Sequence, residues 1–252
     1  MHESRLRKQD IDEEAVAAVR AEVEAEIDQA VEKARSLEAP LVSSLGDFVT
    51  RPRSIVDEPA PVPADAEIFR TMDAIHDALD IELRTDERTF IAGIDVAAGG
   101  NVFGLMRGLH DEYGTRVRDT PISESAIVGA GVGAAMAGMR PVVEIMYLDF
   151  IGVCLDQLLN QAAKLPYMTG GAAEMALTVR TQFGAGRSSG AQHSQSLEAL
   201  LAHIPGLTVV MPSTPADTYG LLRSAIQDPN PVVFIENRLL YGMKGPKPPT
   251  DH

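Results

Sequence analysis

The feature that most constrains the fold of this chain is the alternation of short apolar runs with helical patterns after residue 65. Short apolar runs between turn residues are typical of buried strands, and the segments between them repeat apolar residues at helical spacing. The predicted strands are residues 90–96, 117–119, 142–146, 176–181, 208–211 and 232–235. The predicted helices are residues 102–113, 123–138, 153–164, 196–202 and 215–226, with one more beginning near Asp65. This order predicts an α/β domain in which helices cover both faces of a parallel sheet.

The first 65 residues differ from the rest in charge and in proline content. They carry a net charge of −7 out of −14 for the whole chain. Residues 10–37 predict one amphipathic helix, with a capping box between Asp10 and Glu13. Its apolar stripe is Val16, Val19, Val23, Ile27 and Val31. A lone helix of this kind is marginal in water, so we expect it to dock on another surface.

These differences divide the chain into four parts. Residues 1–39 hold the predicted helix, and residues 40–64 form a linker with five prolines that should be extended. Residues 65–242 form the folded α/β domain, and residues 243–252 are a tail.

Composition excludes several classes of function. A net charge of −14 disfavours binding to nucleic acid or to anionic membrane surfaces. The apolar runs are shorter than the ~18 residues of a membrane span, and the start has no apolar segment of the secretory type. The single cysteine, Cys154, excludes an internal disulfide and fits a reducing cytoplasm; its apolar setting predicts core packing.

The stretch from residue 118 to residue 150 is shaped like a functional site. It places Glu124 in the first turn of a helix rich in glycine and alanine, and then enters an apolar strand. A carboxyl shielded from water holds its proton to higher pH, as acid-base chemistry requires, although a first-turn glutamate also simply favours the helix dipole. Residues 129–134 loosely match a dinucleotide fingerprint. However, PISES occupies the helix entrance, so these glycines fall inside the helix, where they serve packing.

Several motifs in one continuous register, covering roughly residues 66–242, resemble a known family. They are PISE, RPVVEIMYLDF, DQLLNQAAKLPYMTGG, AQHSQSLEALLAHIPGLTVVMPSTPAD and NPVVFIENRLLYG. They resemble the beta subunit of the thiamine diphosphate-dependent decarboxylating component of 2-oxo acid dehydrogenase complexes, of the pyruvate and acetoin type. Residues 10–37 resemble the last helix of the alpha subunit of these enzymes. The resemblance therefore implies a transketolase-like pyrimidine-binding fold, within a fragment of an alpha-beta fusion.

The resemblance gives four residues a role. It implies that Glu124 bonds the pyrimidine ring nitrogen of thiamine diphosphate and drives the tautomer shift that activates the cofactor. It implies that Met146 and Phe150 line the pyrimidine pocket, although ordinary core packing is their plain alternative. It implies that His193, in a loop rich in glycine and serine, faces the cleft and serves the substrate as donor or proton carrier. The alternative for His193 is a solvated histidine near a helix start.

Metal binding follows from the resemblance as well. Several members of the family bind potassium at the turn corresponding to residues 224–231, and the alternative is a helix end whose carbonyls bond water. The candidate ligands are Leu177, Ala225, Ile226, Asp228 and Asn230. The chain lacks the Gly-Asp-Gly pattern by which the alpha subunit holds the diphosphate through magnesium, so an alpha-type partner should supply it. Ile94 stands where the family usually has an acid, which puts any relay through that acid in doubt.

The resemblance implies oxidative decarboxylation of pyruvate or a similar 2-oxo acid, with acyl transfer to a lipoyl group on an acyltransferase component. It also implies an oligomer, with an alpha-type diphosphate-binding domain or subunit completing the site. Two alternatives stay open. One is ketol transfer of the transketolase type, and the other is a non-catalytic interaction module.

Overall fold

The computed structural model describes residues 12–53, 62–63 and 65–249, and the chain divides into two units, Met1–Gly46 and Asp47–His252. The first unit contains helix α2 (Glu13–Ser36) and a short 3-10 helix, η1 (Val42–Ser44). Asp12 caps α2 by accepting a hydrogen bond from the Glu14 backbone N–H at 3.1 Å. The predicted helix is thereby confirmed, while Asp10 lies outside the described residues. No residue of α2 is buried, and its apolar stripe is open to a partner.

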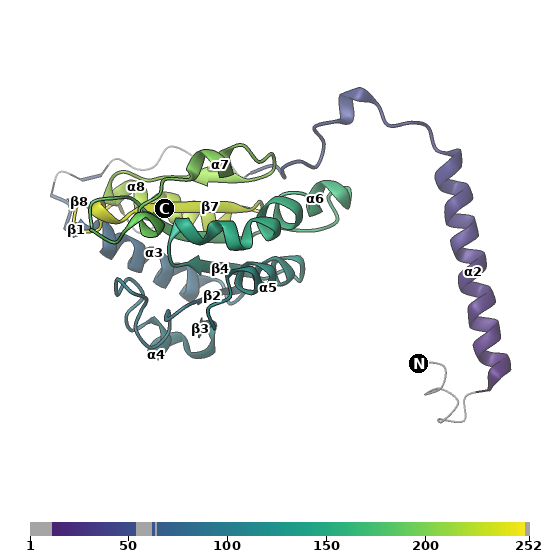
Figure 1. Ribbon diagram of the computed structural model, residues 1–252, viewed down its shortest axis with the longest axis horizontal. Helices are drawn as coiled ribbons and strands as arrows, with labels where there is room; N and C mark the ends of the chain where they lie inside the picture. Colours follow the sequence, from purple (N-terminus) through teal and green to yellow (C-terminus); the bar gives the residue numbers. More distant parts are fainter. Residues whose placement is uncertain (1–11, 54–61, 64, 250–252) are drawn as a thin grey trace. The chain divides into compact units, whose positions relative to one another are not determined.

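The second unit is built on a six-stranded parallel sheet with the order β3-β2-β4-β5-β7-β6 (Figure 1). The strands are β2 (Thr89–Gly93), β3 (Val117–Asp119), β4 (Arg140–Ile145), β5 (Thr178–Phe183), β6 (Thr208–Val210) and β7 (Val232–Asn237). The α-helices are α3 (Thr71–Thr85), α4 (Leu109–Tyr113), α5 (Glu124–Met136), α6 (Leu165–Met168), α7 (Glu198–Ala202) and α8 (Pro215–Gln227). Shorter helical segments are η2 (Gly114–Arg116), η3 (Leu148–Cys154), η4 (Gln157–Ala162), η5 (Ala191–His193) and η6 (Arg238–Leu240). The predicted parallel α/β sheet is confirmed.

The two ends of the folded domain differ from the prediction. The first helix begins at Thr71 rather than near Asp65, because Ile68 belongs to strand β1 (Ile68–Arg70). This strand pairs antiparallel with β8 (Lys244–Pro246), and Ile68 lies opposite Pro246. The tail predicted from residue 243 therefore begins as a strand that pairs with the start of the domain. A three-residue strand with mixed burial carries too little periodicity to be recognised in a sequence.

Two predicted helices are also wrong in part. Residues 102–113 are α-helical only from Leu109, because Gly100, Gly104 and Gly108 adopt positive φ and make turns. Residues 153–164 fall in the 3-10 segment η3 and the π-type segment η4 rather than in one α-helix. The site described below depends on this irregular segment.

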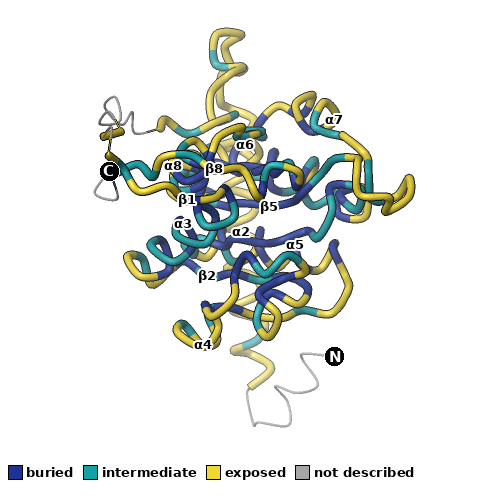
Figure 2. Tube along the Cα trace, turned by 90° about the vertical axis from the view of Figure 1, so that its left-hand side faces the viewer, coloured by how far each residue is buried: buried dark blue, intermediate teal, exposed yellow. Residues whose placement is uncertain are grey.

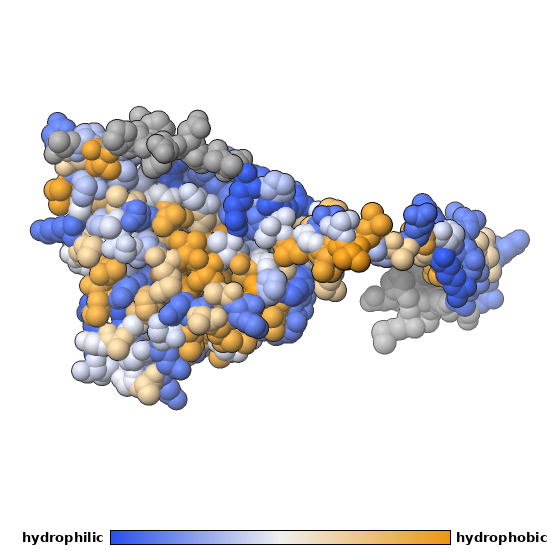
Figure 3. Space-filling view, turned by 90° about the horizontal axis from the view of Figure 1, so that it is seen from above, coloured by the Kyte–Doolittle hydropathy of each residue, from blue (hydrophilic) through white to orange (hydrophobic). Residues whose placement is uncertain are grey.

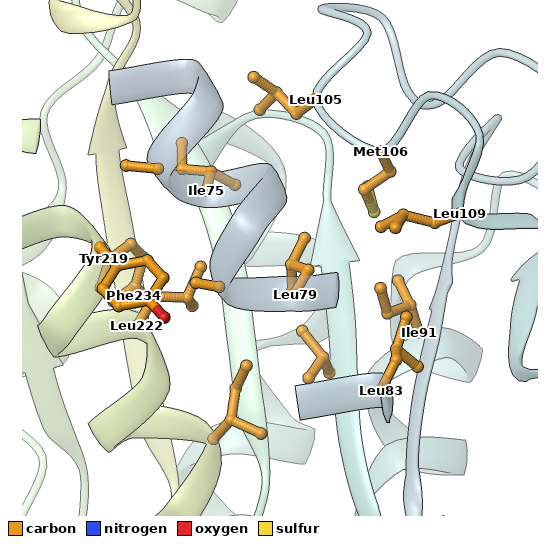
Figure 4. Close-up of a cluster of buried hydrophobic side chains, with 14 of the residues drawn as sticks. Ile75, Leu79, Leu83, Ile91, Leu105, Met106, Leu109, Tyr219, Leu222 and Phe234 are labelled. Atoms are coloured by element: carbon orange, nitrogen blue, oxygen red, sulfur yellow. The ribbon is translucent and has the colours of Figure 1, made fainter. Parts of the chain in front are cut away.

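Two apolar clusters lie on the two faces of the sheet. On one face α3 and α8 pack together, and Figure 4 shows Leu79 and Leu83 of α3 beside Ile91, with Leu222 of α8 near Phe234. On the other face α5, η3 and η4 cover strands β4, β5 and β7. A Cβ atom at Gly131 would meet Val143 and Leu177 at 3.0 Å, so glycine lets α5 approach the sheet closely. Figure 2 shows the central strands as the most buried part of the unit.

Apolar side chains also reach the surface of the second unit, where Figure 3 shows them gathered among polar residues. Ile122, just before α5, is 80% exposed, and Met168 of α6 is 71% exposed. Exposed apolar groups that gather on one surface are typical of a protein-binding site.

A buried ionic network of two carboxylates and one arginine crosses the sheet. Arg180 of β5 donates to Glu144 of β4 at 2.9 Å and to Glu236 of β7 at 2.7 Å. Asn101 donates to the Glu144 carboxylate at 3.0 Å, and the Tyr241 hydroxyl donates to Glu236 at 2.8 Å. Two carboxylates share one cation, so the network favours one retained proton. Burial, offset in part by Arg180 and reinforced by Glu236, raises the pKa of Glu144 to about 7.

The pH dependence of stability tests this network. An unfolded glutamate releases its proton near pH 4.5, whereas folded Glu144 keeps it to about pH 7. The free energy of unfolding should therefore fall as pH rises through this window. Between the two ends of the window, we expect the free energy of unfolding of the natural chain to fall by on the order of 2 kcal/mol more than that of Glu144→Gln, which cannot titrate. Denaturant unfolding at several pH values measures the difference, with exposed Glu87→Gln as control. Parallel profiles for the natural chain and Glu144→Gln would exclude the shared proton.

Candidate cofactor site

Three neighbouring strands of the sheet end at one edge and lead into the segments that carry the candidate residues. Strand β4 leads through Met146 and Tyr147 into η3, and β5 leads through a glycine-rich loop into η5, which ends at His193. Strand β7 leads into η6, which begins at Arg238. The carboxyl ends of parallel strands are where open α/β sheets bind ligands.

Glu124 is the first residue of α5, and its side chain is buried, with 8% of the residue exposed. The helix start is held against η3, since the Ser125 hydroxyl donates to the Val153 carbonyl at 2.5 Å. Burial, followed by the charge of Glu124, raises the pKa of the Cys154 thiol to about 12. No described residue donates a hydrogen bond to the Glu124 carboxylate. A shielded carboxyl of this kind is suited to a hydrogen-bonding partner from outside the chain.

His193 lies against two aromatic rings from the opposite segment. Its ring centroid is 4.8 Å from that of Tyr147 and 5.3 Å from that of Phe150, and both contacts are edge-on. The rings of Tyr147 and Phe150 are themselves 6.1 Å apart. The three rings form one aromatic cluster in which the imidazole of His193 remains half-buried.

Asp149 fixes the loop that carries His193. One oxygen of its carboxylate accepts hydrogen bonds from the backbone N–H groups of Ser194 at 3.2 Å and Gln195 at 3.1 Å. The Gln195 side-chain amide donates to the same oxygen at 3.0 Å. Three donors on one anionic oxygen tie the segment after β5 to the segment after β4.

The structure brings two of the residues that the sequence singles out into direct contact, Phe150 and His193. The start of α5, which bears Glu124, is hydrogen-bonded through Ser125 to the other end of the same segment η3. Met146 is half-buried and packs against the core cluster under α5. Tyr147 and Asp149 were missed, although an aromatic residue and an acid directly after a buried strand are a usable signal.

The candidate potassium ligands lie at the end of α8, in the turn after it and, for Leu177, just before β5, and the backbone oxygens of three of them have donors from this chain. The carbonyl oxygens of Leu177, Ala225 and Ile226 accept hydrogen bonds from the Val232 N–H, the Thr178 hydroxyl and the Arg140 guanidinium, respectively. The Arg140 guanidinium therefore places positive charge at the negative end of the helix.

The side chains of this turn bind the segment that precedes the domain. Asn230 accepts from the Arg51 backbone N–H at 2.6 Å and donates to the Arg51 carbonyl at 3.1 Å. The Arg53 guanidinium donates to Asp228 at 2.5 Å. Within the described residues, no group of His, Cys, Asp and Glu side chains is arranged to hold a metal ion.

Ile94, which stands where an acid is usual, lies in the core under α5 and is 8% exposed. It packs in the same cluster as Val143 and Ile145. An apolar side chain suits this position, so no proton relay passes through it in this chain.

Comparison with known proteins agrees with this geometry. Residues 68–244 match the family described as transketolase, pyrimidine binding domain. This chain belongs to that family. The pyrimidine-binding domain is similar to the beta subunit of acetoin:2,6-dichlorophenolindophenol oxidoreductase of Cupriavidus necator, with 50% identity over 185 residues, 69% of this chain and 55% of the relative. It is also similar to the pyruvate dehydrogenase E1 component subunit beta of Rhizobium meliloti, with 44% identity over 200 residues, 78% of this chain and 43% of the relative.

A third relative is the 2-oxoisovalerate dehydrogenase subunit beta of Bacillus subtilis, with 44% identity over 187 residues, 73% of this chain and 57% of the relative. The resemblance to beta subunits of 2-oxo acid dehydrogenases is thus confirmed. The chain spans about half the length of these curated relatives. A solved structure described as "split gene transketolase, inactive beta4 tetramer" shares the fold, with a TM-score of 0.55 and 18% identity over 67% of this chain and 50% of that one.

No described helix is long and apolar enough to cross a membrane.

Removal of the Asp149 carboxylate tests how the loop of His193 is held. In Asp149→Ala the Ser194 and Gln195 amides lose their acceptor, so their hydrogen exchange should speed up by about tenfold or more. Hydrogen exchange with mass spectrometry or NMR measures this change. Asp156→Ala removes a carboxylate that bonds Gln157 and Asn160, and is the matched control. Unchanged exchange in Asp149→Ala would show that other contacts hold the loop.

Proposed function

We propose that this pyrimidine-binding domain is the beta-type part of a thiamine diphosphate-dependent 2-oxo acid dehydrogenase component. The single observation that carries the proposal is the buried residue Glu124, whose carboxylate has no hydrogen-bond donor among the described residues and which begins a helix held against η3. The printed names of two relatives, which are dehydrogenases of pyruvate and of 2-oxoisovalerate, support this reaction class, whereas a third relative is named for acetoin, a neutral hydroxyketone. The reaction would be oxidative decarboxylation of pyruvate or a related 2-oxo acid, with acyl transfer to a lipoyl group.

The residues present fit the pyrimidine end of the cofactor. Glu124 would share a proton with a ring nitrogen, because a carboxyl shielded from water is a suitable acid and base for a weakly basic nitrogen. Met146 and Phe150 would pack against the ring. Bound thiamine diphosphate supplies a nucleophilic carbon for attack on the 2-oxo group, and the protein supplies position and protons.

His193 would serve the substrate from the other side of the aromatic cluster. Tyr147 and Phe150 fix the plane of its ring, and Asp149 fixes the loop that follows. A histidine held in this way can donate a proton to a developing oxyanion or stabilise it by a hydrogen bond. Its half-buried position leaves part of the residue accessible.

The proposal includes partners that complete the site. An alpha-type domain or subunit would hold the diphosphate through magnesium, and a lipoyl acyltransferase component would accept the acyl group. The exposure of large apolar side chains, such as those of Ile122 and Met168, supports an oligomeric assembly that would cover them. The buried, reduced Cys154 supports a cytoplasmic location.

Substitution of Glu124 tests the function. In the assembly reconstituted with an alpha-type subunit, Glu124→Gln keeps the shape of the side chain but cannot transfer a proton. We expect exchange of the thiazolium proton, followed by NMR, to fall by about 100-fold or more with assembly intact. Glu112→Gln, an exposed first-turn glutamate of α4, is the control. Exchange at the natural rate in Glu124→Gln would reject the assignment, as would tight cofactor binding by the chain without the partner.

We also propose that potassium binds the turn after α8 in competition with Arg53. The ligands would be the oxygens of Leu177, Ala225, Ile226, Asp228 and Asn230. In the natural chain Arg53 already neutralises Asp228, so potassium and sodium chloride should give the same melting temperature. In Arg53→Ala the Asp228 carboxylate is freed, so potassium should raise the melting temperature by about 2 °C relative to sodium. Arg35→Ala, which breaks a surface pair in α2, is the control. Equal melting in both salts for Arg53→Ala would reject the potassium site.

A further inference from the structure

A buried arginine at the candidate site lacks the acceptors that such a group needs. Arg238 begins η6, directly after β7, and only 1% of it is exposed. Its Nε and one Nη atom are shielded from solvent and have no hydrogen-bond partner in the described part of the chain. The only contact recorded for its guanidinium there is with the face of the Tyr147 ring, whose centroid is 5.6 Å from Cζ. A cation in this state is costly to bury unless an anion joins it.

A second buried side chain in the same region is also unsatisfied. Gln182 of β5 is 1% exposed, and neither its amide nitrogen nor its amide oxygen has a hydrogen-bond partner among the described residues. Gln182 lies opposite Glu236 in the sheet, two residues before Arg238. Both side chains therefore belong to the carboxyl ends of adjacent strands, at the edge that bears the candidate site. Native proteins seldom leave several buried polar groups unpaired at one place unless a ligand or an ordered water pairs with them.

The surrounding charges favour an anion at this position. Glu236 is already bonded to Arg180 and to the Tyr241 hydroxyl, so it does not neutralise Arg238. The Arg187 guanidinium lies within 3.5 Å of the Arg238 carbonyl and brings a second positive charge to the edge.

The guanidinium and the amide match a carboxylate in shape. A guanidinium offers parallel N–H groups to the two oxygens of a carboxylate, and a glutamine amide offers one more donor. Tyr147 touches both Arg238 and His193, since its ring lies 5.6 Å from the Arg238 Cζ and 4.8 Å from the His193 ring. A 2-oxo acid bound by its carboxylate at Arg238 would lie on the same ring as His193.

We propose that Arg238, assisted by Gln182, binds the carboxylate of the substrate and so selects a 2-oxo acid over a neutral hydroxyketone such as acetoin. This inference rests on the proposed function for its substrate class. It assigns Arg238 the recognition of charge, whereas Glu124 and His193 serve the chemistry.

The test measures melting of the full chain, without cofactor or partner, in about 50 mM pyruvate, acetoin or sodium chloride at matched ionic strength. Pyruvate should raise the melting temperature of the natural chain by about 2 to 4 °C over chloride, and acetoin should not. Arg238→Met should melt about 2 °C higher than the natural chain in chloride, because an unpaired buried charge is removed, and should lose the pyruvate response. Arg84→Met, on the exposed side of α3, should keep it.

Several outcomes would overturn the proposal. One is a melting temperature of the natural chain that does not rise in pyruvate relative to chloride. The others are a melting temperature that rises equally in Arg238→Met, and one that rises equally in acetoin. A lower melting temperature of Arg238→Met in chloride would show that the arginine is structural. If Arg238→Met does not fold, Gln182→Met and Arg238→Lys decide, and each should at least halve the pyruvate response. If pyruvate has no effect but Arg238→Met weakens assembly with an alpha-type subunit, the anion is a partner carboxylate and the proposal fails.

The two proposals can fail separately. Glu124→Gln should keep the pyruvate response, because no hydrogen bond or ion pair among the described residues joins Glu124 to Arg238. A retained response together with unchanged thiazolium exchange in Glu124→Gln would reject the cofactor role and keep the carboxylate site. A lost pyruvate response together with impaired thiazolium exchange in Glu124→Gln would keep the cofactor role and reject the carboxylate site.

Discussion

The shared cation in the middle of the sheet is the interaction on which the candidate site depends. Arg180 lies between Glu144 and Glu236, so β4, β5 and β7 are tied side by side within the core. A slip of one strand by one residue would move its charge to the other face and leave an unpaired ion in apolar surroundings. The network therefore fixes the register of these strands, and with it the level at which they end. The segments that bear Tyr147, His193 and Arg238 leave the sheet from those ends.

The regular part of the fold could be predicted because its signals are local. The strand at 232–235 is a continuous apolar run, the strand at 142–146 is an apolar run interrupted only by Glu144, and α5 and α8 follow turn or capping residues. Prediction failed where the structure depends on distant pairing or on backbone conformation. Strand β1 exists because β8 lies beside it, and the region from Gly100 to Gly108 makes turns because its glycines adopt positive φ.

The site was predictable only in part, for a related reason. Glu124, Phe150 and His193 belong to motifs, so a resemblance identifies them without geometry. Asp149 and Arg238 act through contacts between segments far apart in the chain, and no spacing reveals such contacts. One signal was available in the sequence, since the buried strands β4, β5 and β7 each carry an ionisable residue among apolar ones.

Segment η3 connects the two halves of the chemistry. Its first turn presents Phe150 to His193, and its other end bonds the start of the helix that bears Glu124, through Val153 and Ser125. The segment is only seven residues long, so both contacts belong to one short piece of chain. Substitutions around Glu124 and around His193 would therefore not be independent, because their neighbours share one segment.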